Sequence, residues 1–182
     1  MLTEPQFAQA VDEALPRLVA LARRLAGDDE IAAEAVQNAL LKASRSWRRF
    51  RGQSSVQTWL TRIVIHCVRD GIAAERKRID RNQPHPDVDR DEPIEVLPDN
   101  EHGPRERAIE RECRQAARVA VQRLPHRQRE VFTMMVWQGM TASEVGEVLE
   151  IAPQAVYSNL NAARNQLRTM LNHFTREAGD AS

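Results

Sequence analysis

The chain has 182 residues, of which seven are glycine, nine are proline and eight are aromatic, and its 26 basic side chains balance 26 acidic ones. This length suits one ordinary domain or two small ones. The sequence has no Asn-Gly or Asp-Gly pair and no alternating run of β-branched residues, which argues against a β-sandwich or barrel. It also has no Gly-rich phosphate-binding motif, no apolar stretch long enough to span a membrane and no signal-peptide pattern. We therefore expect an all-α cytoplasmic protein with no membrane contact.

Reactive side chains give no sign of catalysis. Cys67 and Cys113 each lie in an apolar helical stripe, so both are expected to be buried, reduced thiols. The five histidines have no spacing that would gather them with cysteine or acid around a metal. We expect no catalytic residue, no metal and no cofactor, which disfavours the enzyme class.

Charge is unevenly distributed along this neutral chain. Residues 1–78 carry a net charge of +4, with +8 concentrated in residues 42–78, whereas residues 79–104 carry −6 and residues 105–182 carry +2. Five of the nine prolines also lie in residues 79–104, whose few apolar residues show no helical period. This pattern predicts two small helical domains joined by a flexible acidic linker at 79–104.

The N-terminal domain is expected to begin with two amphipathic helices. Apolar residues recur at spacings of three and four over residues 7–25, and Gly27 is expected to end that helix. Pro16 is expected to interrupt it, because proline lacks the N–H that an inner helical position uses. Asp28 is expected to cap the second helix.

A third helix follows an Arg-rich stretch at residues 47–55. Ser54 and Gln57 have the spacing of a capping box. The helix is expected to leave Arg62 and Arg69 outside the core. Its expected buried residues are Trp59, Leu60, Ile63, Cys67 and Val68.

The C-terminal domain has the pattern of a helix-turn-helix. A first helix is expected to stop at Pro125, which suits the first position of the next helix. Thr141 and Glu144 form a second capping box, residues 150–152 form a short turn, and Pro153 is expected to begin the last helix. This order favours DNA binding, although helical hairpins in bundles look similar.

Two stretches resemble a known family. Residues 124–132 (LPHRQREVF), 139–149 and 155–164 are similar to region 4 of sigma factors, and residues 21–37 and 50–63 (FRGQSSVQTWLTRI) are similar to region 2. Because no other sigma region is present, the chain is identified as a member of the extracytoplasmic-function (ECF) group of the sigma-70 family. The resemblance implies a transcription initiation factor that binds core RNA polymerase and promoter DNA, and it implies an anti-sigma factor as a further partner.

The resemblance also implies a division of labour along the chain. It assigns region 2 to residues 1–78, the linker to 79–104, region 4 to 105–174 and a tail to 175–182. Region 2 would dock on polymerase and melt and read the −10 element, while region 4 would read the −35 element as duplex DNA. Implied −35 contacts are Gln154, Tyr157, Ser158, Asn159, Asn161, Arg164 and Arg168. Implied −10 contacts are Arg48, Phe50, Arg51, Arg62, Ile63, His66 and Arg69, and implied polymerase contacts are Glu34, Gln37, Asn38 and Leu41.

Several positions depart from the family pattern. Tyr157, Asn159 and Ala162 stand where basic residues are common, so fewer phosphate contacts and a shallow salt dependence are expected. Glu150 replaces the usual glycine of the turn, where a positive φ would strain it. The polymerase-docking helix keeps Glu34 but lacks the acids that usually flank it, which predicts a weaker or conditional complex.

Two other functions stay open at this stage. One is a polymerase-independent helix-turn-helix regulator that binds a two-fold operator, for which no leftover apolar face suggests a dimer. The other is a degenerate sigma-like interaction protein that titrates an anti-sigma factor, which the thinned acidic and basic surfaces favour.

Overall fold

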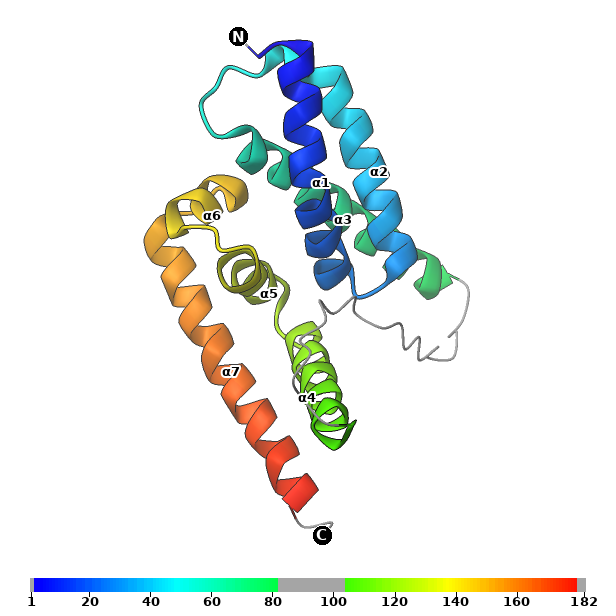
Figure 1. Ribbon diagram of the computed structural model, residues 1–182, viewed down its shortest axis with the longest axis vertical. Helices are drawn as coiled ribbons and strands as arrows, with labels where there is room; N and C mark the ends of the chain where they lie inside the picture. Colours follow the sequence, from blue (N-terminus) through cyan, green and yellow to red (C-terminus); the bar gives the residue numbers. More distant parts are fainter. Residues whose placement is uncertain (1, 82–103, 180–182) are drawn as a thin grey trace.

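A computed structural model describes residues 2–81 and 104–179, with side chains described for residues 2–81 and 111–172. The backbone of these residues is helical, with short connections and no strand, which confirms the expected all-α fold (Figure 1). The centre of the expected linker, residues 82–103, lies outside the described part, whereas residues 79–81 belong to a helix and Pro104 begins another. The N-terminal domain contains α1 (Glu4–Ala26), α2 (Asp29–Ser46), the 3₁₀ turn η1 (Trp47–Arg49) and α3 (Val56–Arg81). The C-terminal domain contains α4 (Pro104–Gln122), α5 (His126–Phe132), the π-helical turn η2 (Thr133–Trp137), α6 (Ala142–Leu149) and α7 (Pro153–Gly179).

The connection between α1 and α2 follows the expected local chemistry. Gly27 ends α1 with φ 71° and ψ 2°, a left-handed conformation that glycine adopts without strain. The Asp28 side chain accepts a hydrogen bond from the Ile31 backbone N–H at 2.9 Å and so caps α2. The expected interruption at Pro16 is wrong, because α1 continues through it. Pro16 is exposed, so water can reach the backbone carbonyl that loses its helical partner.

The start of α3 differs by one residue from the expected capping box. The Ser55 side chain, not that of Ser54, accepts a hydrogen bond from the Thr58 backbone N–H at 3.0 Å. Trp59, expected in the core, is half-buried and lies against Phe50 and Phe7.

Trp47 belongs to the core of the N-terminal domain. Its side chain is only 9% exposed, and its ring stacks on that of Phe7 with the ring centroids 5.5 Å apart. This stacking fixes η1 against the start of α1, so the Arg-rich turn is attached to a rigid support.

Two expectations about α4 and α5 need correction. Pro125 precedes α5 as its N-cap residue and is not its first helical residue. Cys113 is exposed, not buried, while Cys67 is buried as expected. The apolar stripe of α4 meets the core only near its C-terminal end, where Ala120 and Val121 are buried against α7.

The helix-turn-helix has the expected elements α6, turn and α7. Thr141 accepts a hydrogen bond from the Glu144 backbone N–H, and the Glu144 side chain accepts one from the Thr141 backbone, which completes the capping box. The hydrogen bonds that the Thr141 backbone N–H and then its hydroxyl donate to the Glu144 carboxylate lower the pKa of Glu144, because they favour its ionised form. Glu150 has φ 57° and ψ 45°. This is the strained left-handed conformation expected at a position where the family usually has glycine.

Replacing Glu150 with glycine is expected to stabilise the protein by about 1 kcal/mol, since a left-handed conformation costs an L-residue about that much. Urea denaturation would measure the gain. The matched variant Glu147→Gly places glycine inside the same helix and should destabilise by a similar amount. If Glu150→Gly lowered the free energy of unfolding as Glu147→Gly does, the strain at position 150 would be contradicted.

The two domains share one apolar core. Side chains of α1, α2 and α3 cluster with buried residues of α5, η2, α6 and α7, including Val131, Met134, Val145 and Leu160. α6 lies beside α3 (Figure 1), and η2 also contacts α1. The sequence predicts two separate domains, and the structure adds a closed arrangement in which they are packed face to face.

Candidate nucleic-acid and polymerase interface

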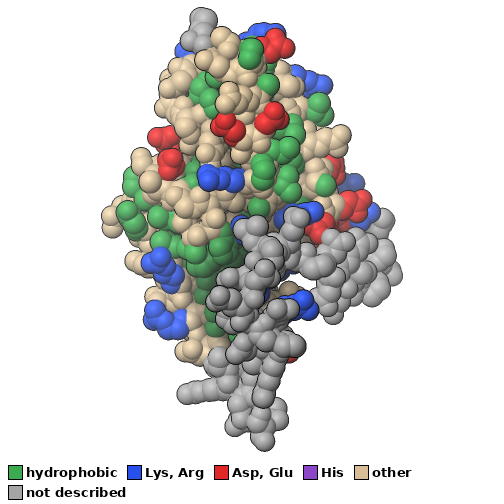
Figure 2. Space-filling model, in the orientation of Figure 1, with side chains coloured by type: hydrophobic (Ala, Val, Ile, Leu, Met, Phe, Trp, Pro, Cys, Tyr) green, Lys and Arg blue, Asp and Glu red, His purple; other side chains and the backbone are tan. Residues whose placement is uncertain are grey.

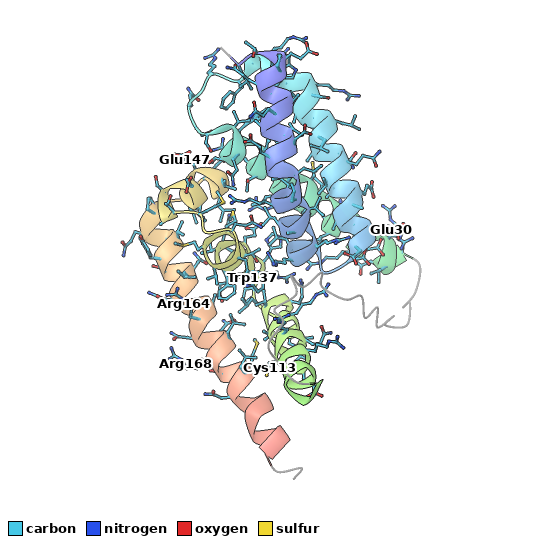
Figure 3. The ribbon with its side chains drawn as sticks, in the orientation of Figure 1. Glu30, Cys113, Trp137, Glu147, Arg164 and Arg168 are labelled. Atoms are coloured by element: carbon cyan, nitrogen blue, oxygen red, sulfur yellow. The ribbon has the colours of Figure 1, made fainter. Side chains whose placement is uncertain are left out.

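The N-terminal half of α7 presents an exposed polar face. Val156, Leu160 and Ala163 are buried and anchor the helix to the domain core. Arg164 and Arg168 project from the side of α7 that is remote from α1–α3 (Figure 3). The other exposed residues of the expected reading face are Gln154, Tyr157, Ser158 and Asn161.

Two polar side chains of this face are bonded to their own helix. The Asn159 amide is half-buried and donates to the Ala155 carbonyl oxygen at 2.8 Å, and the Ser158 hydroxyl donates to the Gln154 carbonyl oxygen at 3.1 Å. Such bonds compete with contacts to an outside partner. Gln154 and Asn161 are therefore better placed than Asn159 to contact DNA bases.

Basic residues are scattered over the face of the molecule that Figure 2 shows. On the face drawn in Figure 2, Lys and Arg side chains lie in separate patches between acidic and apolar ones. Four arginines around η1 are exposed, and the Arg48 guanidinium lies over the Trp47 ring, 4.6 Å from the ring centroid. The exposed arginines of this turn are Arg45, Arg48, Arg49 and Arg51.

The expected −10 pocket is only partly assembled. Phe50 is half-buried and its ring centroid lies 5.4 Å from that of Trp59. Ile63 is half-buried and packs against the core, whereas His66 is exposed on α3. These residues come from two segments, the turn after η1 and the first half of α3.

The structure corrects the expected positions of Arg62 and Arg69. Neither is free on the outside of α3, because each is half-buried and binds the C-terminal domain. Arg62 donates to the backbone carbonyl oxygen of Glu147 in α6. The guanidinium of Arg69 donates to both carboxylate oxygens of Glu130, with its Nε at 2.7 Å and its Nη2 at 2.8 Å.

Glu130 is the centre of a buried charge cluster. Its side chain is 2% exposed, and its carboxylate also lies 3.2 Å from Nδ1 of His126 and 3.6 Å from Nη1 of Arg127. The hydrogen bonds to Glu130 raise the pKa of Arg69. A two-pronged arginine–carboxylate pair of this kind gives both strength and a fixed geometry.

Acid is expected to weaken the packing around Glu130. Burial lowers the pKa of His126 below its usual 6.5 and outweighs the carboxylate of Glu130, while Arg69, Arg129 and Arg127 lower it further. The unfolded chain therefore takes up this proton at a higher pH than the folded chain, so the free energy of unfolding should fall as the pH drops below about 6.5. Urea denaturation from about pH 7.5 to about pH 5.5 would measure the slope, and His126→Gln should reduce it. The same slope in both proteins would contradict this assignment.

Other cross-domain contacts involve residues that the sequence analysis did not single out. Gln122 donates to the Arg24 carbonyl oxygen at 2.6 Å and accepts from Arg129, which also donates to the Leu25 carbonyl oxygen at 3.2 Å. A side chain on Gly27 would come within 2.9 Å of the Gln122 amide, so the fit is close here.

A second group of contacts lies at η2. The Arg24 guanidinium lies 4.8 Å from the centre of the Trp137 ring, and Gln138 donates to the Arg17 carbonyl oxygen at 3.2 Å. Burial lowers the pKa of Arg24, with Arg118 adding to the effect. No local sequence pattern identifies these cross-domain pairs, because their members are about a hundred residues apart and most of them use a backbone carbonyl as the acceptor.

The four expected polymerase contacts share one exposed side of α2. Glu34, Gln37, Asn38 and Leu41 are all exposed, and Leu41 retains 48% of its surface. Beside them lies a groove between α1 and α2, lined mainly by Val19, Ala32, Val36 and Leu40, with Arg23 at its edge. The exposed side of α2 and the adjoining groove are therefore more apolar than a docking surface built from several acids.

The described residues form neither a metal-binding cluster nor a membrane-spanning helix. No three His, Cys, Asp or Glu side chains of residues 2–81 and 111–172 gather where they could hold a metal ion. None of the helices in those segments is both long and apolar enough to cross a membrane.

Comparison with known proteins agrees with this architecture. Residues 10–78 match the family description "Sigma-70 region 2", and residues 114–167 match "Sigma-70, region 4". The chain is 27% identical over 163 residues to the RNA polymerase sigma-H factor of Pseudomonas aeruginosa, which covers 89% of this chain and 84% of that protein. It is 29% identical over 154 residues to the ECF sigma factor SigM of Mycobacterium tuberculosis, which covers 85% of this chain and 71% of the relative.

Solved structures share the same fold. The sigma factor RpoE of Bartonella quintana, determined in complex with the anti-sigma factor NepR, aligns with a TM-score of 0.67 and 24% identity over 91% of this chain and 96% of that one. CnrH, determined in complex with the cytosolic domain of CnrY, aligns with a TM-score of 0.65 and 20% identity over 94% of this chain and 90% of that one. These likenesses concern the fold, whereas the two matched regions, in their expected order, and the curated relatives show that the chain is a sigma factor of the ECF group of the sigma-70 family.

Proposed function

We propose that residues 1–78 dock on core RNA polymerase and open the −10 element, that residues 79–104 act as the connecting linker, and that residues 105–174 read the −35 element. The tail, residues 175–182, has no assigned role. The observation that carries this proposal is the exposed polar face of α7, held on a helix-turn-helix in the same chain as a basic, aromatic turn. The protein would act in the cytoplasm and would carry out no chemistry of its own.

Duplex recognition would depend on α7. Gln154 and Asn161 are exposed and can each pair with the edge of an adenine in the major groove through two hydrogen bonds. Tyr157 and Ser158 would contact neighbouring bases or sugars. Asn159 would do so only after its hydrogen bond to the Ala155 carbonyl oxygen breaks. Arg164 and Arg168 would bind phosphates and set the orientation of the helix.

Single-strand recognition would depend on the turn after η1 and on α3. Arg48 and Arg51 are exposed and can track phosphates, while Phe50 offers an aromatic surface for a displaced base. Ile63 and His66 would contact the same displaced base. Arg62 and Arg69 would bind the phosphates beside it. The last two can do so only when they are released from the C-terminal domain.

Polymerase would bind the exposed side of α2 formed by Glu34, Gln37, Asn38 and Leu41. Because this side carries one acid, we expect a weaker complex than a surface with several acids would form.

Adding acids to that surface is expected to tighten the complex. The double variant Ala33→Glu with Asn38→Asp should bind purified core polymerase more tightly, by a factor of up to about thirty, because each of the two exposed ion pairs contributes up to about 1 kcal/mol. Titration of labelled chain with core enzyme would measure the change. The control Ala73→Glu adds an acid at an exposed position of α3. Unchanged affinity of the double variant would contradict this docking surface.

An anti-sigma factor is the further partner that we propose. The two structural relatives were both determined as complexes: RpoE with the anti-sigma factor NepR, and CnrH with the cytosolic domain of CnrY. Such a partner would bind the exposed α2 side or the reading face of α7.

Sequencing transcript start sites after overexpression tests the function in cells. We expect new transcripts whose upstream regions share two elements at a constant spacing, and we expect Gln154→Ala with Asn161→Ala to remove them. A single two-fold motif would instead indicate a polymerase-independent regulator. Activation of another sigma factor's promoters by both the wild-type chain and that variant would indicate titration of an anti-sigma factor.

A further inference from the structure

Four aromatic rings form a chain that links the start of α1 to the turn after η1. The Phe50 ring centroid lies 5.4 Å from that of Trp59, and the Trp59 centroid lies 6.4 Å from that of Phe7 in an edge-on arrangement. Phe7 in turn stacks on Trp47, with the ring centroids 5.5 Å apart and an angle of 8° between the ring planes. Figure 1 shows the turn that follows α2 beside the first turns of α1. Phe7 therefore contacts both tryptophans that lie on either side of this turn in the sequence.

The backbone and the side chain of Phe50 are held by different tryptophans. Its backbone N–H donates to the Trp47 carbonyl oxygen at 3.0 Å, at the end of η1. Its ring lies against Trp59, which belongs to the first turns of α3. Phe7 is the ring that the two tryptophans share. It therefore supports the backbone of Phe50 through Trp47 and the side chain of Phe50 through Trp59.

The segment that follows Phe50 supplies little further restraint. Residues 51–55 form no helix, and Arg51, Gly52 and Gln53 are exposed. Gly52 has φ 70°, and a side chain added there would meet no atom within 4 Å. A side chain beside such a segment would lose conformational freedom when it binds a base, and holding it in place beforehand reduces that cost. The ring contacts are therefore the interactions that can preorganise Phe50, which is half-buried and keeps part of its ring accessible.

We propose that Phe7 is a positioning residue for the −10 strand: through Trp47 and Trp59 it holds Phe50 where a displaced base can stack on it. This inference rests on the proposed function, because it concerns the same base contact. Phe7 acts only through its neighbours, since its ring is half-buried and stacked on Trp47. The apolar spacing of α1 predicts a core position for Phe7 and does not indicate this role.

The test uses holoenzyme assembled from purified core polymerase and the full chain. Phe7→Leu keeps an apolar side chain but removes the ring, whereas Phe7→Tyr keeps the ring. Leu15→Ala is the matched control, because Leu15 is a half-buried residue of the same helix, packs on the same core and takes no part in the ring contacts. The probe is a single-stranded DNA that carries the −10 element of a promoter recovered from the overexpression experiment, with each base of the element substituted in turn.

Phe7→Leu is expected to bind this strand about five- to tenfold more weakly, which is part of the about 5- to 150-fold loss expected when Phe50→Ala removes the stacking surface. It should also discriminate less well among bases at the displaced position. Phe7→Tyr should retain wild-type affinity and discrimination, and Leu15→Ala should lower the free energy of unfolding without changing either. Wild-type binding by Phe7→Leu would overturn the proposal. So would an equal loss in Leu15→Ala or in Phe7→Tyr.

A double-variant cycle tests whether Phe7 acts through Phe50. Phe7→Leu should weaken binding in the wild-type background and add no further loss in the Phe50→Ala background, whereas independent effects would multiply. Multiplied losses would overturn the positioning role. If Phe7→Leu loses its helical circular dichroism, Phe7→Met replaces it under the same criteria, because the flexible methionine side chain fills irregular gaps.

The variant Phe50→Ala distinguishes failure of this proposal from failure of the proposed function. Wild-type binding by Phe50→Ala would overturn the −10 contact itself, and the role of Phe7 with it. Weaker binding by Phe50→Ala together with wild-type binding by Phe7→Leu would overturn the role of Phe7 alone.

Discussion

Replacing Gly146 with alanine is expected to destabilise the C-terminal domain by about 1–3 kcal/mol and to abolish −35-dependent transcription. An alanine side chain at this buried position would lie 2.7 Å from the backbone carbonyl oxygen of Ile151. That oxygen belongs to the turn between α6 and α7 and cannot move without displacing the start of α7. The clash outweighs the gain of about 1 kcal/mol that alanine brings in a helix.

Urea denaturation and transcription from a cognate promoter would measure the two effects of Gly146→Ala. Glu147→Ala is the control, because it changes the next residue of the same helix at an exposed position. A Gly146→Ala protein with unchanged stability would show that the turn has more freedom than the close approach of Gly146 and Ile151 allows.

Alanine at Gln154 and Asn161 is expected to reduce promoter-specific transcription strongly. If each side chain makes a two-bond contact with an adenine, each substitution costs about 1–3 kcal/mol, or about 5- to 150-fold in affinity for the site. The free energy of unfolding should change little, since both residues are exposed. Transcription in vitro from promoters with single substitutions in the −35 element would measure the effect.

The pattern of base preference distinguishes recognition from a general loss of binding. A variant that loses a base contact should accept substitutions at the base that it no longer reads. Asn165→Ala, an exposed change one turn further along α7, should leave the preference intact. Full activity of the Gln154 and Asn161 variants, with wild-type base preference, would contradict their proposed role.

Features that depend on near neighbours could be predicted from the sequence. Gly27, Asp28 and the Thr141–Glu144 capping box involve residues within four positions of one another, and all occur as expected. The error at Ser55 is a shift of one residue at a helix end, where adjacent serines can both serve as a cap.

Features that depend on packing partners could not be predicted. Cys113 lies on an apolar stripe whether or not another helix covers it, and the structure leaves it exposed. Arg69 and Glu130 are 61 residues apart and belong to different domains. A pattern of helical faces indicates that Arg69 points away from its own core but does not identify the carboxylate that it meets.

Transcription with purified core RNA polymerase tests the central claim most directly. The account predicts that adding this chain produces transcripts that start at defined positions on a template carrying a promoter recovered from the overexpression experiment, and that the core enzyme alone does not. It also predicts that the chain elutes with the core enzyme in size-exclusion chromatography. Absence of both specific transcripts and a complex with core polymerase would contradict the claim that the two packed helical domains serve to bring polymerase to promoters.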